Sequence, residues 1–200
     1  MENIQKMVNF LFELAGAKTT ARTGWQRIGV KVPESMADHC ALSGQIAFVL
    51  ATMEGANAER AAALAIFHDT AELRLGDANW VARVYLDHEN VKERAQNDQI
   101  DGVSAAPQLK AIFDELKDCK TKEAQIAWDA DSLDMAIQAK YYIANGNKKA
   151  ELWIESIAGA FKTESAKQIF AAIKNSGIED WWMELEPIKK KFNRLRGSEK

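Results

Sequence analysis

Side chains of the types that bind metal ions interrupt three apolar, alanine-rich segments of the chain. His39 follows the run PESMAD, His68 and Asp69 stand side by side in IFHDTAELRLGD, and three aspartates interrupt residues 128–136, WDADSLDMA. A buried carboxylate without a partner is costly, because it loses its hydration and gains no interaction in return. A divalent metal ion accepts imidazole and carboxylate ligands together and compensates the negative charge. The three segments therefore predict one shared metal site.

The spacing within the second segment would place a catalytic group beside this site. In a continuous helix, His68 and Asp69 point about 100° apart around the axis, so both can reach one point above the helix. Glu72 would lie one turn after His68 on the same face. It is therefore suited to orient or deprotonate a water molecule at the metal. Two histidines and two carboxylates would leave coordination positions open, as catalysis requires.

The third segment leaves open which aspartate would bind the ion. Asp129 and Asp131 are two residues apart and lie on different helix faces, so we do not expect both to reach one ion. Asp134 lies near Asp131, three residues further on. Taken alone, each histidine is ordinarily a core or surface residue with a satisfied hydrogen bond. The coincidence of three interrupted segments favours the metal site.

The segments that must position these groups are all expected to be helices. Apolar residues recur with helical spacing, and no series of segments alternates as strands do. Ser35 and Asp38 form a possible capping box that opens a helix extending to about residue 52. Further helices are expected over residues 58–75 and 121–144. The result is an all-α fold with the metal site between helices.

The remaining segments are expected to complete a single domain over residues 1–200. Residues 18–33 read as a loop, and two or three further helices are expected from about residue 148 to residue 195. Pro187 should kink or interrupt the last of these helices. No segment has the composition of a linker that would divide the chain.

Composition narrows the classes of function. The 26 basic and 29 acidic residues give a net charge of −3, which argues against a broad contact with a nucleic-acid polymer. A small anionic substrate needs only a few local cations and stays possible. Cys40 and Cys119 form no metal-binding spacing and predict free thiols in the cytoplasm. The apolar N-terminal segment is too short to span a membrane, so no membrane association is expected.

Four motifs together resemble a known family. They are TGWQR at residues 23–27, PESMADH at 33–39, HDTAELRLGD at 68–77 and DADSLD at 129–134. This set is similar to the H…HD…D signature of the HD-domain metal-dependent phosphohydrolases. Within that family it resembles the small proteins related to the bacterial 5′-deoxynucleotidase and to the eukaryotic HD-domain-containing protein 2. The resemblance covers about residues 1–145 and implies a single HD domain, whereas residues 148–195 carry no matching motif.

The resemblance implies a ligand set and a reaction. The residues that match the family's metal ligands are His39, His68, Asp69 and Asp131, and Glu72 matches its catalytic glutamate. The reaction implied is release of phosphate from a nucleoside 5′-monophosphate, with a preference for deoxyribose. The cofactor implied is one divalent metal ion, Co²⁺, Mn²⁺ or similar, with Mg²⁺, Zn²⁺, Fe²⁺ and Ni²⁺ also possible. Family members are commonly dimers, so a homodimer is expected.

The resemblance also suggests residues that contact the substrate. Asp77 resembles a family aspartate that accepts a hydrogen bond from the sugar, and its alternative role is the N-cap of the next helix. Trp25 matches a tryptophan that lies against the sugar, and its alternative role is core packing. Gly24 departs from the bacterial nucleotidase, which has an arginine there. Arg22 or Arg27 is the candidate for the phosphate contact instead.

Two other functions use the same residues. One is hydrolysis of a different phosphoester, such as a cyclic nucleotide, a nucleoside triphosphate or an alarmone, and the short chain and its TGW and PES motifs argue against it. The other is a module that binds metal or nucleotide without efficient catalysis. Glu72 argues against that alternative, because such a module has no need of it.

Overall fold

The computed structural model describes residues 4–195, except for the side chain of His88. Within these residues every regular element is a helix, and the one isolated β-bridge joins Ala21 to Ser35. The predicted all-α class is confirmed. No helix among the described residues is long and apolar enough to cross a membrane.

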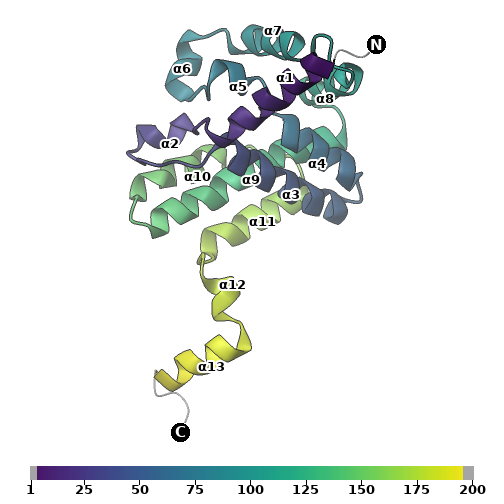
Figure 1. Cartoon of the computed structure of the whole chain (residues 1–200). Helices are drawn as coiled ribbons and strands as arrows, with labels where there is room; N and C mark the ends of the chain where they lie inside the picture. The colour runs from purple at the N-terminus through teal and green to yellow at the C-terminus, as the bar shows by residue number, and fades with distance from the viewer. Residues whose placement is uncertain (1–3, 196–200) are drawn as a thin grey trace.

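Three helices form the centre of the fold: α3 (Met36–Glu54), α4 (Ala58–Phe67) and α9 (Lys122–Ala144). They pack against one another, and Figure 1 shows them side by side. Alanines fill their mutual contacts, and small side chains let helix backbones approach closely. Those that are fully buried include Ala47, Ala51, Ala61, Ala65, Ala130 and Ala136.

The predicted start and end of α3 are confirmed. The Asp38 N–H donates to Ser35 Oγ over 3.1 Å, and the Ser35 N–H donates back to Asp38 Oδ2 over 2.9 Å, which completes the capping box. Gly55 ends the helix with φ of 64°, a left-handed conformation that glycine adopts without a steric penalty. These local signals place His39 in the first turn of a buried helix.

The expected single helix over residues 58–75 is wrong. α4 ends at Phe67, a turn follows, and α5 (Glu72–Leu75) begins a new helix. The Thr70 hydroxyl donates to the Phe67 carbonyl over 2.8 Å, so a side chain competes for an acceptor of the helix. His68 and Glu72 therefore do not share a helix face, and the turn brings them to the same region instead.

The remaining helices formed by residues 4–118 lie, like α5, outside the central three. They are α1 (Ile4–Ala15), η1 (Gly16–Lys18), α2 (Thr23–Arg27), α6 (Trp80–Tyr85), α7 (His88–Ile100) and α8 (Ala106–Asp118). The expectation of a loop over residues 18–33 is wrong where α2 forms. The Asp77 carboxylate accepts the N–H groups of Thr23 and Gly24 over 2.6 and 3.3 Å, and it caps α2 from a distant part of the chain.

The C-terminal part contains more helices than the two or three expected. η2 (Lys148–Ala150), α10 (Glu151–Ile157) and α11 (Glu164–Asn175) pack on α9. Figure 1 shows α12 (Asp180–Met183) and α13 (Glu186–Leu195) extending away from the other helices. Pro187 lies in the first turn of α13, where its missing N–H costs no helical hydrogen bond. It marks a helix start and does not kink a helix.

Candidate metal centre and substrate cleft

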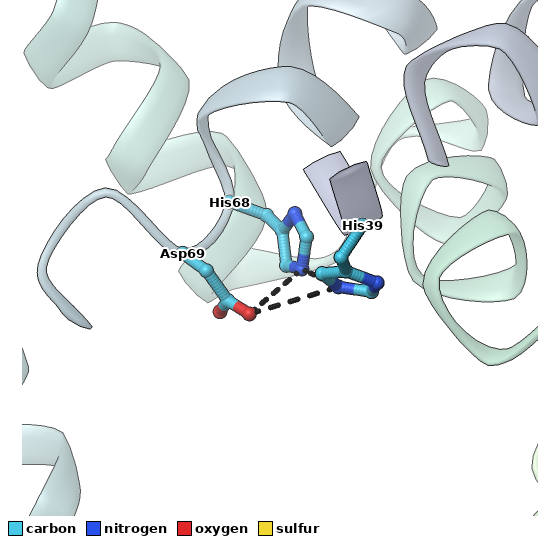
Figure 2. Close-up of side chains that lie close together, drawn as sticks. All are labelled: His39, His68 and Asp69. Atoms are coloured by element: carbon cyan, nitrogen blue, oxygen red, sulfur yellow. Dashed lines mark hydrogen bonds and ion pairs between the residues drawn. The ribbon is translucent and has the colours of Figure 1, made fainter. Parts of the chain in front are cut away.

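Donor atoms from three of the predicted ligand positions converge between α3 and the turn after α4. His68 Nε2 lies 3.0 Å from Asp69 Oδ2 and 3.2 Å from His39 Nε2, and the distance from His39 Nε2 to Asp69 Oδ2 is 3.9 Å. Figure 2 shows the two rings and the carboxylate directed toward one another. All three side chains are buried. Such a group of imidazole nitrogens and a carboxylate oxygen can hold a divalent metal ion.

The fourth predicted ligand joins them from α9. Asp131 Oδ1 lies 3.1 Å from His39 Nε2 and 3.7 Å from His68 Nε2. We call His39, His68, Asp69 and Asp131 the donor cluster. It draws one residue from α3, two from the turn after α4 and one from α9, so the packing of the three central helices creates it.

The other two aspartates of α9 have different roles. Asp134 Oδ2 lies 2.5 Å from His39 Nδ1, on the far side of that ring. Asp129 accepts hydrogen bonds from the N–H groups of Lys162 and Thr163 over 2.8 and 2.7 Å. Asp129 and Asp131 point to opposite sides of the helix, as the helical repeat requires for residues two apart. Asp134 thus orients the ring of His39, whereas Asp129 holds the segment before α11 in place.

The hydrogen bonds of the two rings support metal binding. His39 Nδ1 faces the Asp134 carboxylate and His68 Nδ1 faces the Ala65 carbonyl over 2.6 Å, so each Nδ1 carries a proton as donor. In the neutral rings both Nε2 atoms are then acceptors, and they face each other over 3.2 Å. Two lone pairs repel at that distance unless a cation lies between them. The arrangement therefore suits a metal ion, and in its absence a proton.

Charged neighbours of the donor cluster produce the expected pKa shifts. Burial lowers the pKa of His68, but Asp69 and Asp131 outweigh it and hold that pKa well above its usual value. Burial alone would raise the pKa of Asp69, but His68, Lys92 and Arg22 hold it well below its usual range. Arg22 Nη1 lies 3.3 Å from Asp69 Oδ2, and Lys92 Nζ lies 3.5 Å from Asp69 Oδ1. The cluster thus carries ionised carboxylates in a buried place.

Glu72 is fully buried below the cleft surface, beside the cluster. Burial, then repulsion from Asp69 and Asp77, raises the pKa of Glu72 to about 8. Arg83 Nη2 lies 3.6 Å from Glu72 Oε1. A carboxyl group with such a pKa can take up or release a proton near neutral pH, which is the property required of a general base.

Asp77 holds the α2 segment against the turn that follows α5. It accepts the Thr23 hydroxyl over 2.8 Å as well as the backbone donors of α2, and Arg22 Nη1 lies 3.3 Å from Asp77 Oδ1. The expected alternative role as N-cap of the next helix is wrong, because Asn79 caps α6. A contact between Asp77 and a sugar stays a prediction.

A cleft with a cavity volume of about 240 Å³ opens above the donor cluster. The predicted site residues that line it are Arg22, Trp25, Arg27, Asp69, Asp77 and Asp131. His39, His68 and Glu72 lie beneath its surface. Trp25 is only 1% exposed, and its indole N–H donates to Glu34 Oε1 over 2.8 Å, so the predicted core packing applies to most of this ring. Its contact with a sugar stays a prediction.

The cleft also contains residues that the sequence analysis did not identify as site residues. Arg83 and Lys92 add positive charge, and Trp80, Trp128 and Trp153 add aromatic surface. Lys92 belongs to α7, for which the sequence analysis gave no site residue. Trp153 lies in the part of the chain without a matching motif. A Cβ atom added to Gly24 would lie 3.4 Å from Trp153 Cζ2, so Trp153 occupies the space beside the glycine that departs from the family pattern.

The fold and the site together define a class: a helical protein with a two-histidine, two-aspartate centre between its helices, under a cationic cleft. The chain belongs to the HD-domain family, because the sequence profile described as HD domain matches residues 14–174. The match extends past residue 145, so it includes α10 and most of α11.

Individual relatives are similar to most of the chain. The 5′-deoxynucleotidase hdd1 of Schizosaccharomyces pombe is 32% identical over 160 residues, which cover 73% of this chain and 77% of the relative. The 5′-deoxynucleotidase HDDC2 of Dictyostelium discoideum is 31% identical over 149 residues, covering 68% and 78% of the two chains. A conserved hypothetical protein from Pyrococcus furiosus has a similar structure, with a TM-score of 0.73, 28% identity and coverage of 84% and 99%.

Proposed function

We propose that the protein is a metal-dependent phosphohydrolase that releases phosphate from nucleoside 5′-monophosphates, with a preference for deoxyribose. The observation that carries the proposal is the convergence of four donor atoms beneath a cleft lined by Arg22, Arg27, Arg83 and Lys92. Cations around a metal site suit a phosphate dianion. The names of the curated relatives support a deoxynucleotide as substrate.

The residues have distinct roles in this proposal. His39, His68, Asp69 and Asp131 hold the metal ion, which supplies positive charge that polarises phosphoryl oxygens and makes water more acidic. Glu72 orients the attacking water and takes its proton. Arg22 or Arg27 binds the phosphate, Trp25 lies against the sugar, and Asp77 accepts a hydrogen bond from it. Arg22 also neutralises Asp69.

A phosphate-release screen tests the proposal. Metal-depleted protein is supplied with Mg²⁺, Mn²⁺, Co²⁺, Zn²⁺, Fe²⁺ or Ni²⁺ and with each ribo- and deoxynucleoside 5′-monophosphate. Cyclic nucleotides, nucleoside triphosphates and an alarmone are included as competing phosphoesters. We expect turnover of deoxynucleoside monophosphates only with added metal, highest with Co²⁺ or Mn²⁺. Full activity of rigorously metal-free protein would contradict the proposal, and tight nucleotide binding without turnover under any metal would favour a non-catalytic module.

We also propose that the protein forms a homodimer. The outward face of α3 carries no charge between His39 and Glu54, and Phe48, Val49 and Met53 are about half exposed on it. Trp181 and Leu185, on the extended C-terminal segment, are exposed as well. Uncovered apolar side chains of this kind favour association. Sedimentation of the wild type as a monomer at micromolar concentration would contradict the proposal, and we expect Val49→Lys to shift a dimer toward monomer.

The proposal extends to the native metal ion and to the location of the protein in the cell. The donor set of two imidazoles and two carboxylates suits Co²⁺ or Mn²⁺. Cys40 and Cys119 are free thiols, which is compatible with the predicted cytoplasmic location. Metal analysis of protein purified from its native source, together with cell fractionation, tests both points.

A further inference from the structure

Three tryptophans from separate segments stack at the mouth of the cleft. The ring centroids of Trp25 and Trp153 lie 4.9 Å apart at an interplanar angle of 29°, and those of Trp80 and Trp153 lie 4.7 Å apart at 16°. Trp153, on α10, is therefore in the middle. All three rings line the cleft that also contains Asp69 and Asp131. The aromatic stack and two carboxylates of the donor cluster therefore line the same cleft.

The three rings of the stack differ in how deeply they are buried. Trp25 is 1% exposed and Trp153 is 7% exposed, and both pack against Ala139 and Ala150 in a common apolar cluster. Trp80 is 52% exposed. The Trp25–Trp153 pair is thus a fixed platform, whereas Trp80 is the member that water already reaches.

The helix that carries Trp80 has few side chains buried against the body. α6 has six residues, and Val84 and Tyr85 at its far end are mostly exposed. Besides the stacking of Trp80 on Trp153, its attachment includes polar contacts, such as the hydrogen bond from Asn79 Nδ2 to Thr23 Oγ1 over 2.9 Å and the ion pair of Arg83 with Glu72 over 3.6 Å. A segment with so little buried apolar surface opens at low free-energy cost. Trp80 can therefore separate from Trp153 without disturbing the core.

We propose that the Trp80–Trp153 pair is a nucleobase subsite, in which the base inserts between the two indole rings. This proposal rests on the proposed function, because it requires a nucleotide substrate. The near-parallel rings are stacked in contact, so a planar base that inserts between them must separate them by about one ring thickness, roughly 3.5 Å. Trp153 provides the fixed face, and Trp80 closes over the base. With no base present, the rings cover each other.

This mode of binding predicts broad base tolerance. Every base has an aromatic face, so stacking discriminates by ring size more than by hydrogen-bonding pattern. We expect purine nucleotides to bind more tightly than pyrimidine nucleotides, and all four bases to be accepted. Gly24 contributes indirectly, because a larger side chain there would press against Trp153.

A comparison of two substrates tests the subsite. 2′-Deoxyadenosine 5′-monophosphate and 2-deoxyribose 5-phosphate contain the same phosphoester, and only the first has a base. In Trp80→Ala we expect the ratio of their kcat/KM values to fall about tenfold, mainly through KM for the nucleotide, because one stacking face is lost. Trp80→Phe should restore most of the ratio. Tyr85→Ala is the matched control, since this aromatic side chain on the same helix is 83% exposed and lies outside the cleft.

Two outcomes would overturn the subsite. One is an unchanged ratio in Trp80→Ala, and the other is an equal loss for both substrates, which would indicate a role in the architecture of the cleft. If the wild type hydrolyses neither compound with any metal, the proposed hydrolysis fails. Equilibrium dialysis with 2′-deoxyadenosine then decides the subsite separately. Weaker binding to Trp80→Ala than to the wild type supports it, and absent or equal binding overturns it.

Discussion

The donor cluster lies between long helices, whereas the mouth of the cleft is made of short ones. α3 has 19 residues and α9 has 23, and their buried alanines bring them close to α4. α2, α6 and α10 have five, six and seven residues. The donor cluster is buried and each imidazole is held at its second nitrogen, but the mouth depends on ring stacking and exposed cations.

This difference corresponds to what the two regions must do. Metal ligands have to be placed to within a few tenths of an ångström, and a close-packed interior provides that accuracy. A nucleotide has to enter and leave, and weakly attached elements permit the motion. We therefore expect substitutions in the donor cluster to abolish function, and substitutions at the mouth to change preference.

The largest effect is expected from Asp131 on α9, and Asp129 on the same helix serves as the comparison. Asp131→Asn should lose metal binding and more than about 100-fold of the phosphate release, because it removes a direct donor. Asp129→Asn should retain metal and lower the free energy of unfolding by about 1–3 kcal/mol, because its hydrogen bonds serve only the segment before α11. Metal titration and thermal unfolding measure the two properties. Equal loss of metal binding in both variants would contradict the assignment of Asp131, and not Asp129, as a metal ligand.

The next effect concerns the buried carboxyl group beside the cluster. Glu72→Gln should lower kcat by about 10²–10⁴, because the amide cannot accept a proton, while metal binding is retained. The melting temperature at neutral pH should stay the same or rise, because a raised folded-state pKa destabilises the fold above the ordinary value of 4.5 and glutamine removes this contribution. Activity within tenfold of the wild type would exclude Glu72 as the base.

A smaller effect is expected where a side chain supports a donor without binding the ion. Asp134→Asn keeps an acceptor for His39 Nδ1 but removes the negative charge opposite it. Metal affinity should fall about 10- to 100-fold, and activity at saturating metal should largely recover. Competition with a fluorescent chelator measures the affinity. An unchanged affinity would show that His39 is positioned by packing alone.

The smallest effect concerns Glu54, at the end of α3 away from the donor cluster. Hydrogen bonds from the Ser165 N–H and hydroxyl, and then Lys122, lower the pKa of Glu54 to about 2. A lowered folded-state pKa stabilises the fold above the ordinary value of 4.5, and this contribution is lost as the pH falls toward 2. Glu54→Gln should therefore cost about 1 kcal/mol or less at pH 6 and less again at pH 3.

Thermal unfolding of both proteins across this pH range measures the change. A difference in stability that does not depend on pH would exclude ionisation of Glu54 as its cause. Metal affinity is the control readout, and it should stay unchanged because Glu54 ties α3 to α9 and α11 away from the donor atoms.

Local signals account for the parts of the fold that could be predicted. The Ser35 capping box involves neighbours within a few residues, so it marked the start of α3 correctly. The break after Phe67 could not be predicted from periodicity, because apolar spacing continues through it and a single hydroxyl of Thr70 competes for the helix acceptor. The helix α2 was missed because its cap, Asp77, lies more than fifty residues further along the chain.

The candidate site could likewise be predicted only in part from the sequence. His39, His68 and Asp69 were identified because their chemistry contradicts the apolar pattern around them. Helix geometry separated Asp129 from Asp131 but could not say which one faces the histidines, and only the resemblance favoured Asp131. Nothing in the pattern around Trp153 or Lys92 indicated that either would face the cleft.

The sequence by itself determined the helical class and the types of donor available to a metal ion, because side-chain chemistry and helical periodicity act over a few residues. The tertiary structure decided which aspartate meets the two histidines, which cations surround Asp69 and which rings form the aromatic stack. Those contacts join residues from distant helices. They depend on how the helices pack against one another, and no local pattern in the chain contains that information.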